Sequence, residues 1–324
     1  MNSSRLAQLS VFVAGHRGLV GSAVVREFAR VRTGSVITRD RSQLDLEDAA
    51  ATSTFFAKER PQVVVLAAAK VGGILANNSY PVDFLMRNLR IEANVFGSAH
   101  ESGIERILFL GSSCIYPRDC PQPIREDYLL TGPLEPTNRS YALAKIAGVE
   151  MCWAYNRQYG ARDLAIMPTN LYGPGDNYDL SNAHVLPALI RKMHEAKASG
   201  APKVVLWGTG TPRREFLHVD DLARAVAFLA NLEGDAYEQL TAPSVCPLIN
   251  VGAGGDITIR ELAEVVKEVV GYRGDFVYDP SKPDGTPRKM LDIGRMRLLG
   301  WSPRIPLREG IALAYRDFLS QGAR

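Results

Sequence analysis

The segment GHRGLVG, residues 15–21, constrains the possible fold of this chain more than any other part of the sequence. It places Gly15, Gly18 and Gly21 between a short apolar run, SVFVAG, and SAVVREFARV, whose apolar residues recur at helical spacing. Glycines let the backbone turn tightly and approach a pyrophosphate, which then binds at the helix N-terminus. A glycine-rich turn without a ligand is the alternative. The position of this turn after the first strand of a βαβ series favours a dinucleotide site.

The rest of the first half repeats this alternation of strand and helix. Apolar strands are predicted over SVFVAG, SVITRD, QVVVLAAA, RILFLGSS and DLAIMPTNLYG, with helices over EDAAATSTFFAKER, PVDFLMRNLRIEANVFGSAHESG and SYALAKIAGVEMCWAYNRQYG between the later ones. Continuous apolar strands separated by helices predict a parallel sheet that is covered on both faces. The expected fold class is therefore α/β, a Rossmann-type doubly wound parallel sheet that binds ligands at the carboxyl ends of its strands.

The alternation breaks after Gly173, which predicts a second, smaller α/β domain. We expect residues 1–172 and roughly 216–253 to form the dinucleotide-binding domain, because HVDDLARAVAFLANL is typical of a helix and LINVGAG of a late sheet strand. Residues 173–215 and 254–324 are then expected to form the C-terminal substrate domain. Helices are predicted there over LPALIRKMHEAKASG, TIRELAEVVKEVVG and LREGIALAYRDFLS, and a strand over KVVLWGTG.

Composition excludes several classes of function. The net charge of +3 on 324 residues is small, and the bases are interleaved with acids, so we expect no nucleic-acid surface. No signal peptide is visible, and the run VVVLAAA is too short to span a bilayer, so we expect a cytoplasmic protein without a membrane segment. The four cysteines, Cys114, Cys120, Cys152 and Cys246, lack paired metal-ligand spacing, so no metal site is expected. Because disulfides are rare in cytoplasmic chains, we expect most of them to be reduced.

The end of the second predicted strand bears on the choice between NAD and NADP. An acidic residue that binds the ribose of NAD is expected there, and Asp40 stands in TRDRSQLDL. Arg39 and Arg41 flank Asp40, and Arg17 lies inside the glycine loop. Guanidinium groups can bind a 2′-phosphate through charge-assisted hydrogen bonds, so we expect NADP(H). The alternative is that these arginines lie at the surface beside an NAD-binding Asp40.

The segment YALAK predicts a reductase pair. Tyr141 and Lys145 are one helical turn apart, so both project from one face of the predicted helix. The lysine ammonium can favour ionisation of the phenol and hold the nicotinamide ribose, while the tyrosine donates a proton to a carbonyl oxygen. An exposed helix face is the alternative for this common spacing. Ser112, at the end of the fourth predicted strand, could bind the same substrate oxygen, which favours the catalytic interpretation.

The glycine loop, Ser112, Tyr141 and Lys145, in this order and spacing, resemble the extended short-chain dehydrogenase/reductase family over essentially the whole chain. The resemblance implies an NAD(P)-dependent enzyme that acts on a nucleotide sugar held by its C-terminal domain. Further segments resemble the branch that converts GDP-4-keto-6-deoxy-D-mannose to GDP-L-fucose by 3,5-epimerisation and NADPH-dependent 4-reduction. They are AGHRGLVGSA, AAAKVGGILANN, LGSSCIYP, EPTNRSYALAKIAG, MPTNLYGPGDNYD, SNAHVLPAL and REFLHVDDLA.

The resemblance also assigns site residues. Contacts with the cofactor are expected from Gly15, His16, Arg17, Gly18, Leu19, Val20, Gly21, Arg39, Arg41, Leu110, Gly111, Lys145, Pro168, Asn170, Leu171 and His184. Contacts with the GDP-sugar are expected from Lys192, Trp207, Arg214 and Asp284. Arginine suits a phosphate and an indole suits a base face, although Arg213 could replace Arg214 and each of these could be a solvated surface residue. Family members form homodimers through two long helices, so a homodimer is expected.

Epimerisation next to a ketone needs two further groups. A 4-ketone acidifies the hydrogens at C3 and C5, so inversion requires a base, an acid and donors at the C4 oxygen, which Ser112 and Tyr141 can supply. The resemblance places the base at Cys114 and the acid at His184. A cysteine at a strand end is otherwise a small buried residue, and a loop histidine a polar one. Along a strand, Ser112 and Cys114 should share one face and Ser113 the other.

Two other functions remain open at this point. A 4,6-dehydratase of the same family usually has a glutamate shortly after the serine, where SSCIYP has Cys114. A 4-epimerase would retain NAD tightly, which the arginine-rich strand end disfavours. A cofactor-sensing protein without turnover could keep the glycine loop but would not need Ser112, Tyr141 and Lys145 together.

Overall fold

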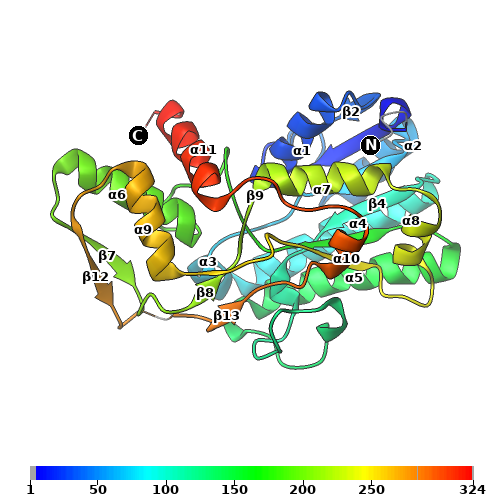
Figure 1. Cartoon of the computed structure of the whole chain (residues 1–324). Coiled ribbons are helices and arrows are strands. Elements are labelled where there is room, and N and C mark those ends of the chain that lie inside the picture. Colours follow the sequence, from blue (N-terminus) through cyan, green and yellow to red (C-terminus); the bar gives the residue numbers. More distant parts are fainter. Residues whose placement is uncertain (1–4, 283, 323–324) are drawn as a thin grey trace.

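A six-stranded parallel sheet forms the centre of the larger part of the molecule (Figure 1). The computed structural model describes residues 5–282 and 284–322, and leaves the side chains of residues 74 and 75 undescribed. The strand order is β10-β5-β4-β3-β1-β2. The strands are β1 (Ser10–Ala14), β2 (Ser35–Ile37), β3 (Val63–Leu66), β4 (Arg106–Leu110), β5 (Leu164–Pro168) and β10 (Leu248–Val251).

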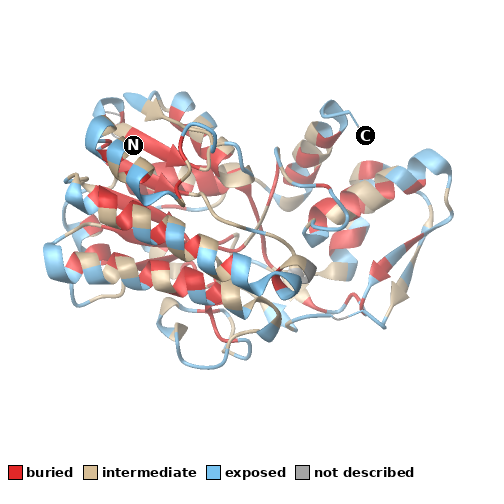
Figure 2. Cartoon of the chain, turned by 180° about the vertical axis from the view of Figure 1, so that it is seen from behind, coloured by how far each residue is buried: buried red, intermediate tan, exposed pale blue. Residues whose placement is uncertain are grey.

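Helices cover both faces of this sheet, because alternate strand residues point to opposite sides. In β1, Val11 and Val13 belong to one core, and Phe12 and Ala14 belong to the other. The first core is covered by α1 (Leu19–Arg30), α7 (Val219–Asn231) and α8 (Gly234–Thr241). The second is covered by α2 (Ala49–Glu59), α4 (Pro81–Glu101) and α5 (Arg139–Tyr159), whose buried residues face the sheet (Figure 2). The predicted doubly wound α/β fold is confirmed.

A smaller α/β layer lies at the other end of the molecule (Figure 1). This layer contains the third hydrophobic core of the molecule. Helices α6 (Val185–Ser199), α9 (Ile259–Val270) and α11 (Leu307–Ser320) pack there with the parallel pair β7 (Lys203–Trp207) and β12 (Asp275–Asp279). Short strands join the two parts: β6 (Asn170–Tyr172) pairs with β9 (Phe216–His218), and β8 (Arg213–Arg214) lies between β11 (Ile257–Thr258) and β13 (Arg288–Lys289).

The segment that follows β13 returns to the larger part. Leu291 and Ile293 pack in the second core, while Met296, in α10 (Gly294–Leu298), and Trp301 pack in the first. The division of the chain into two discontinuous domains stays a prediction. Our proposed boundary now assigns residues 291–301 to the dinucleotide-binding part, because their apolar side chains are buried there.

The expected strand over RILFLGSS is too long. Strand β4 ends at Leu110, and a 3₁₀ turn, η2 (Ser113–Ile115), follows it. Ser112 caps this turn, since its Oγ accepts from the Cys114 amide at 3.5 Å. A serine hydroxyl that bonds to nearby backbone competes with the sheet ladder, which explains the early end. The prediction that Ser113 points to the opposite face from Ser112 and Cys114 assumed that all three lie on a strand. It is wrong, because they lie in and before a 3₁₀ turn and all three line the same cavity.

The remaining helical turns are short: α3 (Ile74–Ser79), η1 (Leu6–Gln8), η3 (Glu126–Tyr128) and η4 (Pro136–Asn138). Among the helices of the described residues, none combines the length and apolar character needed to cross a membrane. The described part of the chain also contains no cluster of three or more His, Cys, Asp or Glu side chains that could hold a metal ion.

Candidate active site

One cavity of 1790 Å³ contains every residue that the sequence assigned to catalysis, cofactor or substrate. It runs from the glycine loop, past the carboxyl ends of β1, β3, β4 and β5, to the smaller part of the molecule. Residues that are far apart in the sequence, such as Arg17 and Asp284, line the same space. Their individual roles stay predictions. Their common location follows from the parallel sheet, which brings the strand ends to one edge.

The glycine loop has the shape of a cradle for a pyrophosphate. Gly15 has a φ of +83°, and a Cβ there would lie 2.7 Å from the Ala68 backbone nitrogen. A Cβ on Gly21 would lie 2.2 Å from the carbonyl oxygen of Gly15. Gly18 is the N-cap of α1 and offers no capping side chain, so the first helical N–H groups face the cavity free of such a cap. This geometry fits a dinucleotide.

Arginines and acids alternate at the end of the cavity next to the glycine loop. Arg17 pairs with Asp40 at 2.9 Å, and Arg39 pairs with Glu59 at 2.8 Å. The Arg41 guanidinium contacts Asp45 and Glu47, each at 3.0 Å. Arg17, Arg39 and Arg41 all line the cavity. Carboxylates hold the three guanidinium groups in place and balance their charge, and guanidinium groups are suited to binding a phosphate.

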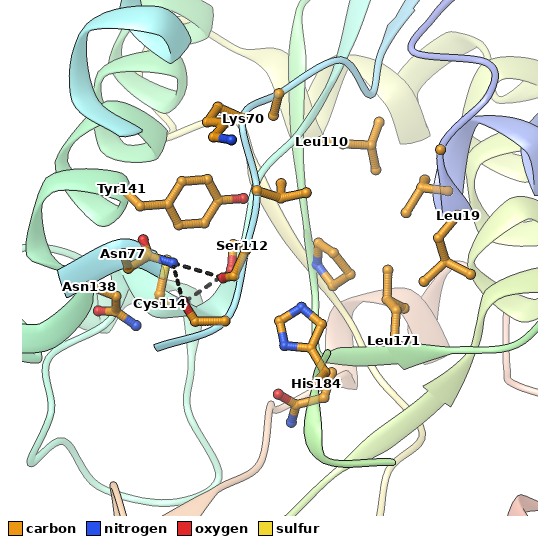
Figure 3. A pocket seen from close by; sticks show the side chains of 18 of the residues that line it. Leu19, Lys70, Asn77, Leu110, Ser112, Cys114, Asn138, Tyr141, Leu171 and His184 are labelled. Carbon is orange, nitrogen blue, oxygen red and sulfur yellow. Dashed lines mark hydrogen bonds between the residues drawn. The ribbon is translucent and has the colours of Figure 1, made fainter. Parts of the chain in front are cut away.

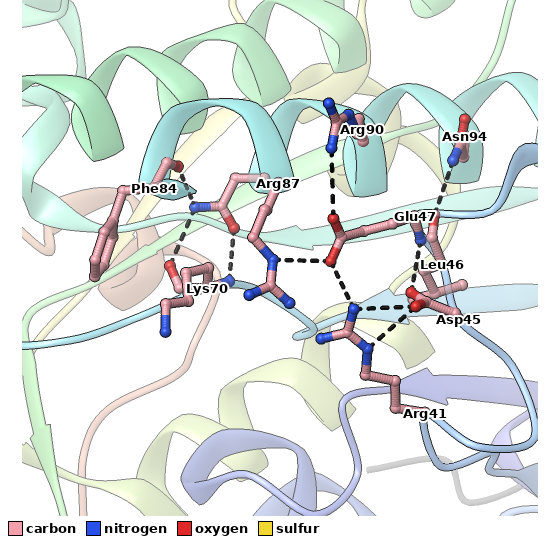
Figure 4. A network of polar contacts seen from close by, with 10 residues as sticks. Arg41, Asp45, Leu46, Glu47, Lys70, Phe84, Arg87, Arg90 and Asn94 are labelled. Carbon is pink, nitrogen blue, oxygen red and sulfur yellow. Dashed lines mark hydrogen bonds and ion pairs between the residues drawn. The ribbon is translucent and has the colours of Figure 1, made fainter. Parts of the chain in front are cut away.

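Glu47 organises the outer part of this network (Figure 4). It lies between Arg41 and two arginines of α4, Arg87 at 2.9 Å and Arg90 at 3.9 Å. Neither Glu47 nor Arg87 was assigned a role from the sequence, although both line the cavity. Their contact joins the second-strand end to α4, so the arginine-rich end is fixed to a long helix.

The reductase set is buried. Lys145 is 1% exposed, and its Nζ lies 4.5 Å from the Phe109 ring centroid and 5.9 Å from that of Tyr141. Tyr141 packs edge-on against Phe84. Burial raises the pKa of the Tyr141 phenol, and the neighbouring Cys114 and Glu92 add to this rise. The expected ionisation of the phenol is therefore not favoured here. A protonated phenol at neutral pH is the state that a proton donor needs.

Glu92 is a site residue that the sequence reasoning missed. Its Oε1 lies 3.3 Å from Lys145 Nζ, and its own exposure is also 1%. Burial raises the pKa of Glu92 to about 7, although Lys145 opposes the shift. The sequence did contain a signal for this role, because Glu92 lies on the buried face of α4 together with Asn88, Val95 and Phe96. A charge at an apolar position of a helix indicates a buried partner.

Cys114 and His184 meet the cavity from two different segments (Figure 3). Cys114 is 7% exposed, and burial raises the pKa of its thiol, while the charges of Lys289 and Lys145 act in the opposite direction. His184 is the N-cap of α6, but its side chain makes no capping hydrogen bond. Burial lowers the pKa of His184. Both groups are thus uncharged at neutral pH in this state.

The distant end of the cavity carries the residues expected for the nucleotide. The Trp207 ring is exposed, and the Lys192 and Lys282 ammoniums each lie 5.5 Å from its centroid. The Asp284 carboxylate accepts from the amide and hydroxyl of Thr209 at 2.7 and 2.8 Å.

The structure distinguishes Arg213 from Arg214 as candidate ligands of the diphosphate. Arg214 lines the cavity. Arg213 pairs with Asp256 at 2.8 Å and is not part of the cavity lining.

Together, a doubly wound sheet, a glycine cradle and a Ser–Tyr–Lys group in one cavity define a nucleotide-dependent oxidoreductase of the short-chain type. The model of the NAD dependent epimerase/dehydratase family matches residues 11–241, and the chain belongs to that family.

Curated relatives are similar over nearly the whole chain. The chain is 56% identical to the probable GDP-L-fucose synthase 1 of Oryza sativa subsp. japonica, over 95% of this chain and 92% of that protein. It is 52% identical to the GDP-L-fucose synthase of Escherichia coli (strain K12), over 98% and 99% of the two chains. Among solved structures, the GDP-D-glycero-L-gluco-heptose synthase of Campylobacter jejuni, determined in the presence of NADPH, has a TM-score of 0.89 at 32% identity. That match covers 98% of this chain and 99% of the other.

Proposed function

We propose that this protein converts GDP-4-keto-6-deoxy-D-mannose to GDP-L-fucose, by inverting C3 and C5 and then reducing C4 with NADPH. One observation carries the proposal: Cys114 and His184 line the same cavity as Ser112, Tyr141 and Lys145. Reduction of a ketone needs the last three residues alone. Two further proton-transfer groups in that cavity are what inversion beside a ketone requires. The names of the curated relatives support the same substrate and product.

NADP(H) fits the cradle and the arginines next to it. The backbone of residues 15–21 would hold the pyrophosphate, and Arg17, Arg39 and Arg41 would hold the 2′-phosphate. When bound, the cofactor supplies the hydride that reduces C4.

The chain's own groups manage the protons at C4. Ser112 and Tyr141 donate hydrogen bonds to the C4 oxygen, which stabilises the enolate during epimerisation. In the reduction, Tyr141 transfers its proton to that oxygen. Lys145 then faces the resulting phenolate with its ammonium, held by the ion pair with Glu92.

For the inversions we propose Cys114 as base and His184 as acid. Burial keeps the thiol protonated in this state, so its activation depends on the cations that oppose the effect of burial, Lys289 and Lys145. Burial also leaves His184 uncharged, so the imidazole must take up a proton before it acts as the acid. At the far end of the cavity, Lys192, Trp207, Arg214 and Asp284 would hold GDP, with the indole against the base and Arg214 at the diphosphate.

We also propose a homodimer formed through α4 and α5. The two helices pack against each other, and they expose Val82, Met86, Leu143 and Tyr159. A cytoplasmic location is part of the proposal as well, because all four cysteines are unpaired thiols, as in a reducing compartment.

Incubation with GDP-4-keto-6-deoxymannose and NADPH tests the whole reaction, with NMR identification of the product. GDP-L-fucose is expected, together with a preference for NADPH over NADH. Turnover without inversion at C3 and C5 would instead indicate a simple 4-reductase.

The two chemical steps can be separated with Cys114→Ser. We expect this variant to slow exchange of the C3 and C5 hydrogens with solvent deuterium by at least ~10²-fold, the lower range for acid–base groups, with unchanged NADPH affinity. Exchange at the rate of the unsubstituted protein would show that Cys114 is not the base.

A further inference from the structure

A single ammonium lies between two acidic side chains beside the cavity. The Lys145 Nζ lies 3.3 Å from Glu92 Oε1 and 5.9 Å from the centroid of the Tyr141 ring. Lys145 and Glu92 are each 1% exposed, so water screens neither charge. Lys145 and Tyr141 line the cavity, whereas Glu92, which comes from α4, does not. Glu92 can therefore act on the reaction through these neighbours and not by touching the substrate.

The carboxylate of Glu92 has few partners. Its Oε1 accepts from Lys145, while its buried Oε2 has no hydrogen-bond partner within the described part of the chain. Hydrogen bonds to a carboxylate favour its ionised form, so a buried carboxylate with one partner takes up a proton readily. Burial accordingly raises the pKa of Glu92 to about 7, although the charge of Lys145 opposes the rise. Both protonation states of Glu92 are thus populated near neutral pH.

The charged groups around Glu92 are few. Helices α2 and α5 pack against α4, and among the described residues Lys145 is the one cation whose charge acts on the pKa of Glu92. In return, the charge of Glu92 raises the pKa of the Tyr141 phenol and of the Cys152 thiol, both on α5. Cys114 acts on the Tyr141 phenol in the same direction. The charge of Glu92 therefore reaches the proton donor of the reductase.

Reduction creates a second anion beside the same ammonium. When Tyr141 gives its proton to the C4 oxygen, a buried phenolate remains, and a buried charge needs a counter-ion. If Glu92 is protonated, the whole charge of Lys145 is available to the phenolate. If Glu92 is ionised, one ammonium faces two anions, and Tyr141 becomes a weaker acid.

We infer that Glu92 is a positioning residue that competes with the Tyr141 phenolate for the Lys145 ammonium, so that reduction at C4 is faster when Glu92 is protonated. This inference rests on the proposed function. Inversion at C3 and C5 uses Cys114 and His184 and leaves Tyr141 protonated, so it should not follow the charge of Glu92. The pair thus makes the reductase step, and not the epimerase step, sensitive to pH through this carboxyl group.

Glu92→Gln tests the competition, because the amide keeps the shape of the side chain and an oxygen for Lys145 but does not ionise. Single-turnover oxidation of NADPH is measured with the doubly inverted 4-keto sugar, which needs reduction alone. Between about pH 6 and 8 we expect the rate of the unsubstituted protein to fall at least about threefold, and that of Glu92→Gln to show no such fall. The two proteins should react equally fast at the lower pH. The same fall in both, or a slower Glu92→Gln protein at the lower pH, would overturn the inference.

The matched control is Glu101→Gln, which makes the same change on the same helix at an exposed position outside the cavity lining. Its rates should follow those of the unsubstituted protein at every pH. Exchange of the C3 and C5 hydrogens with solvent deuterium is then measured with NADP⁺ in place of NADPH. Glu92→Gln should leave this exchange unchanged, whereas slower exchange would indicate a general disturbance of the site and would refute a specific effect on reduction.

Infrared spectroscopy of the protein without substrate reports on Glu92 independently of turnover. The difference spectrum between the unsubstituted protein and Glu92→Gln should contain the carbonyl band of a protonated carboxylic acid below pH 7 and lose it above, since the pKa of Glu92 is about 7. If the unsubstituted protein does not reduce the keto sugar, the proposed function fails. If it does, and the band is absent or unchanged with pH, the competition alone is refuted.

Discussion

Lys145 and Glu92 form an ion pair in which neither charge reaches water, since each residue is 1% exposed. Breaking such a pair leaves one uncompensated buried charge, so it is strongly destabilising even where the intact pair adds little stability. The arrangement fixes the ammonium beside the Tyr141 ring. The catalytic tyrosine thus depends on a carboxylate from a different helix.

The raised pKa of Glu92 has a consequence for stability. In the folded protein this pKa is about 7, whereas an unperturbed glutamate titrates near ~4.3. Between these values the unfolded chain has released the proton and the folded chain retains it. The stabilisation that Glu92 contributes is therefore full below pH ~4.3 and is lost as the pH rises through 7. Thermal unfolding from pH 5 to 8 should show a steeper decline for the unsubstituted protein than for Glu92→Gln. Parallel curves would contradict the buried titration.

Tyr141→Phe removes the proton donor and little else, because the ring can keep its contact with Phe84. We expect NADPH oxidation to fall by at least ~10²-fold, the range of a general acid, with unchanged NADPH affinity in a fluorescence titration. Full activity in this variant would remove Tyr141 from the mechanism.

In the glycine loop and the start of α1, Gly18 and Gly21 have different surroundings. A Cβ on Gly21 would meet the Gly15 carbonyl oxygen at 2.2 Å, whereas a Cβ on Gly18 would have that oxygen as its nearest neighbour at 3.5 Å. Gly18 also has ordinary extended dihedral angles. Gly21 is therefore required by the fold itself, and Gly18 is free to serve a ligand.

This difference predicts two distinct outcomes. Gly21→Ala should destabilise the protein by about 1–3 kcal/mol in urea unfolding, as overpacking does. Gly18→Ala should unfold like the unsubstituted protein and yet bind NADPH more weakly, since its Cβ would enter the cradle. A large loss of stability in Gly18→Ala would refute this separation of roles.

For the whole molecule, Glu215 joins segments from both parts. It lies between β8 and β9 and is fully buried. Its Oε1 accepts from the Gly254 amide at 2.7 Å, and its Oε2 accepts from the Leu291 amide at 2.9 Å. The neighbouring Arg214 lines the nucleotide end of the cavity, so this junction also positions the residues expected to bind GDP.

Glu215→Ala leaves the buried Leu291 amide and the partly buried Gly254 amide without their acceptor, and each unsatisfied buried donor costs about 1–3 kcal/mol. The variant should lose at least about 2 kcal/mol in urea unfolding and show a raised KM for the GDP-sugar. Glu215→Gln keeps one acceptor and should lose less. Equal stability of Glu215→Ala and the unsubstituted protein would mean that the junction is held by other contacts.

Much of this protein was determined locally by its sequence. Gly15 and Gly21 enforce a tight turn, strand periodicity determines two covered faces, and helical spacing puts Tyr141 and Lys145 on one side of α5. The parallel sheet then predicted that the assigned residues would meet at one edge, because these effects act within a few residues or through repeating patterns.

The tertiary structure alone decided which buried polar groups have partners. Glu92 lies 53 residues from Lys145 in the sequence, and the two side chains meet because α4 packs against α5. The end of β4 at Leu110 likewise depended on the Ser112 hydroxyl bonding to the Cys114 amide. Burial and pairing between distant segments carry no local periodicity. The sequence therefore predicted where the site lies, and the folded chain decided how its charges and acceptors are satisfied.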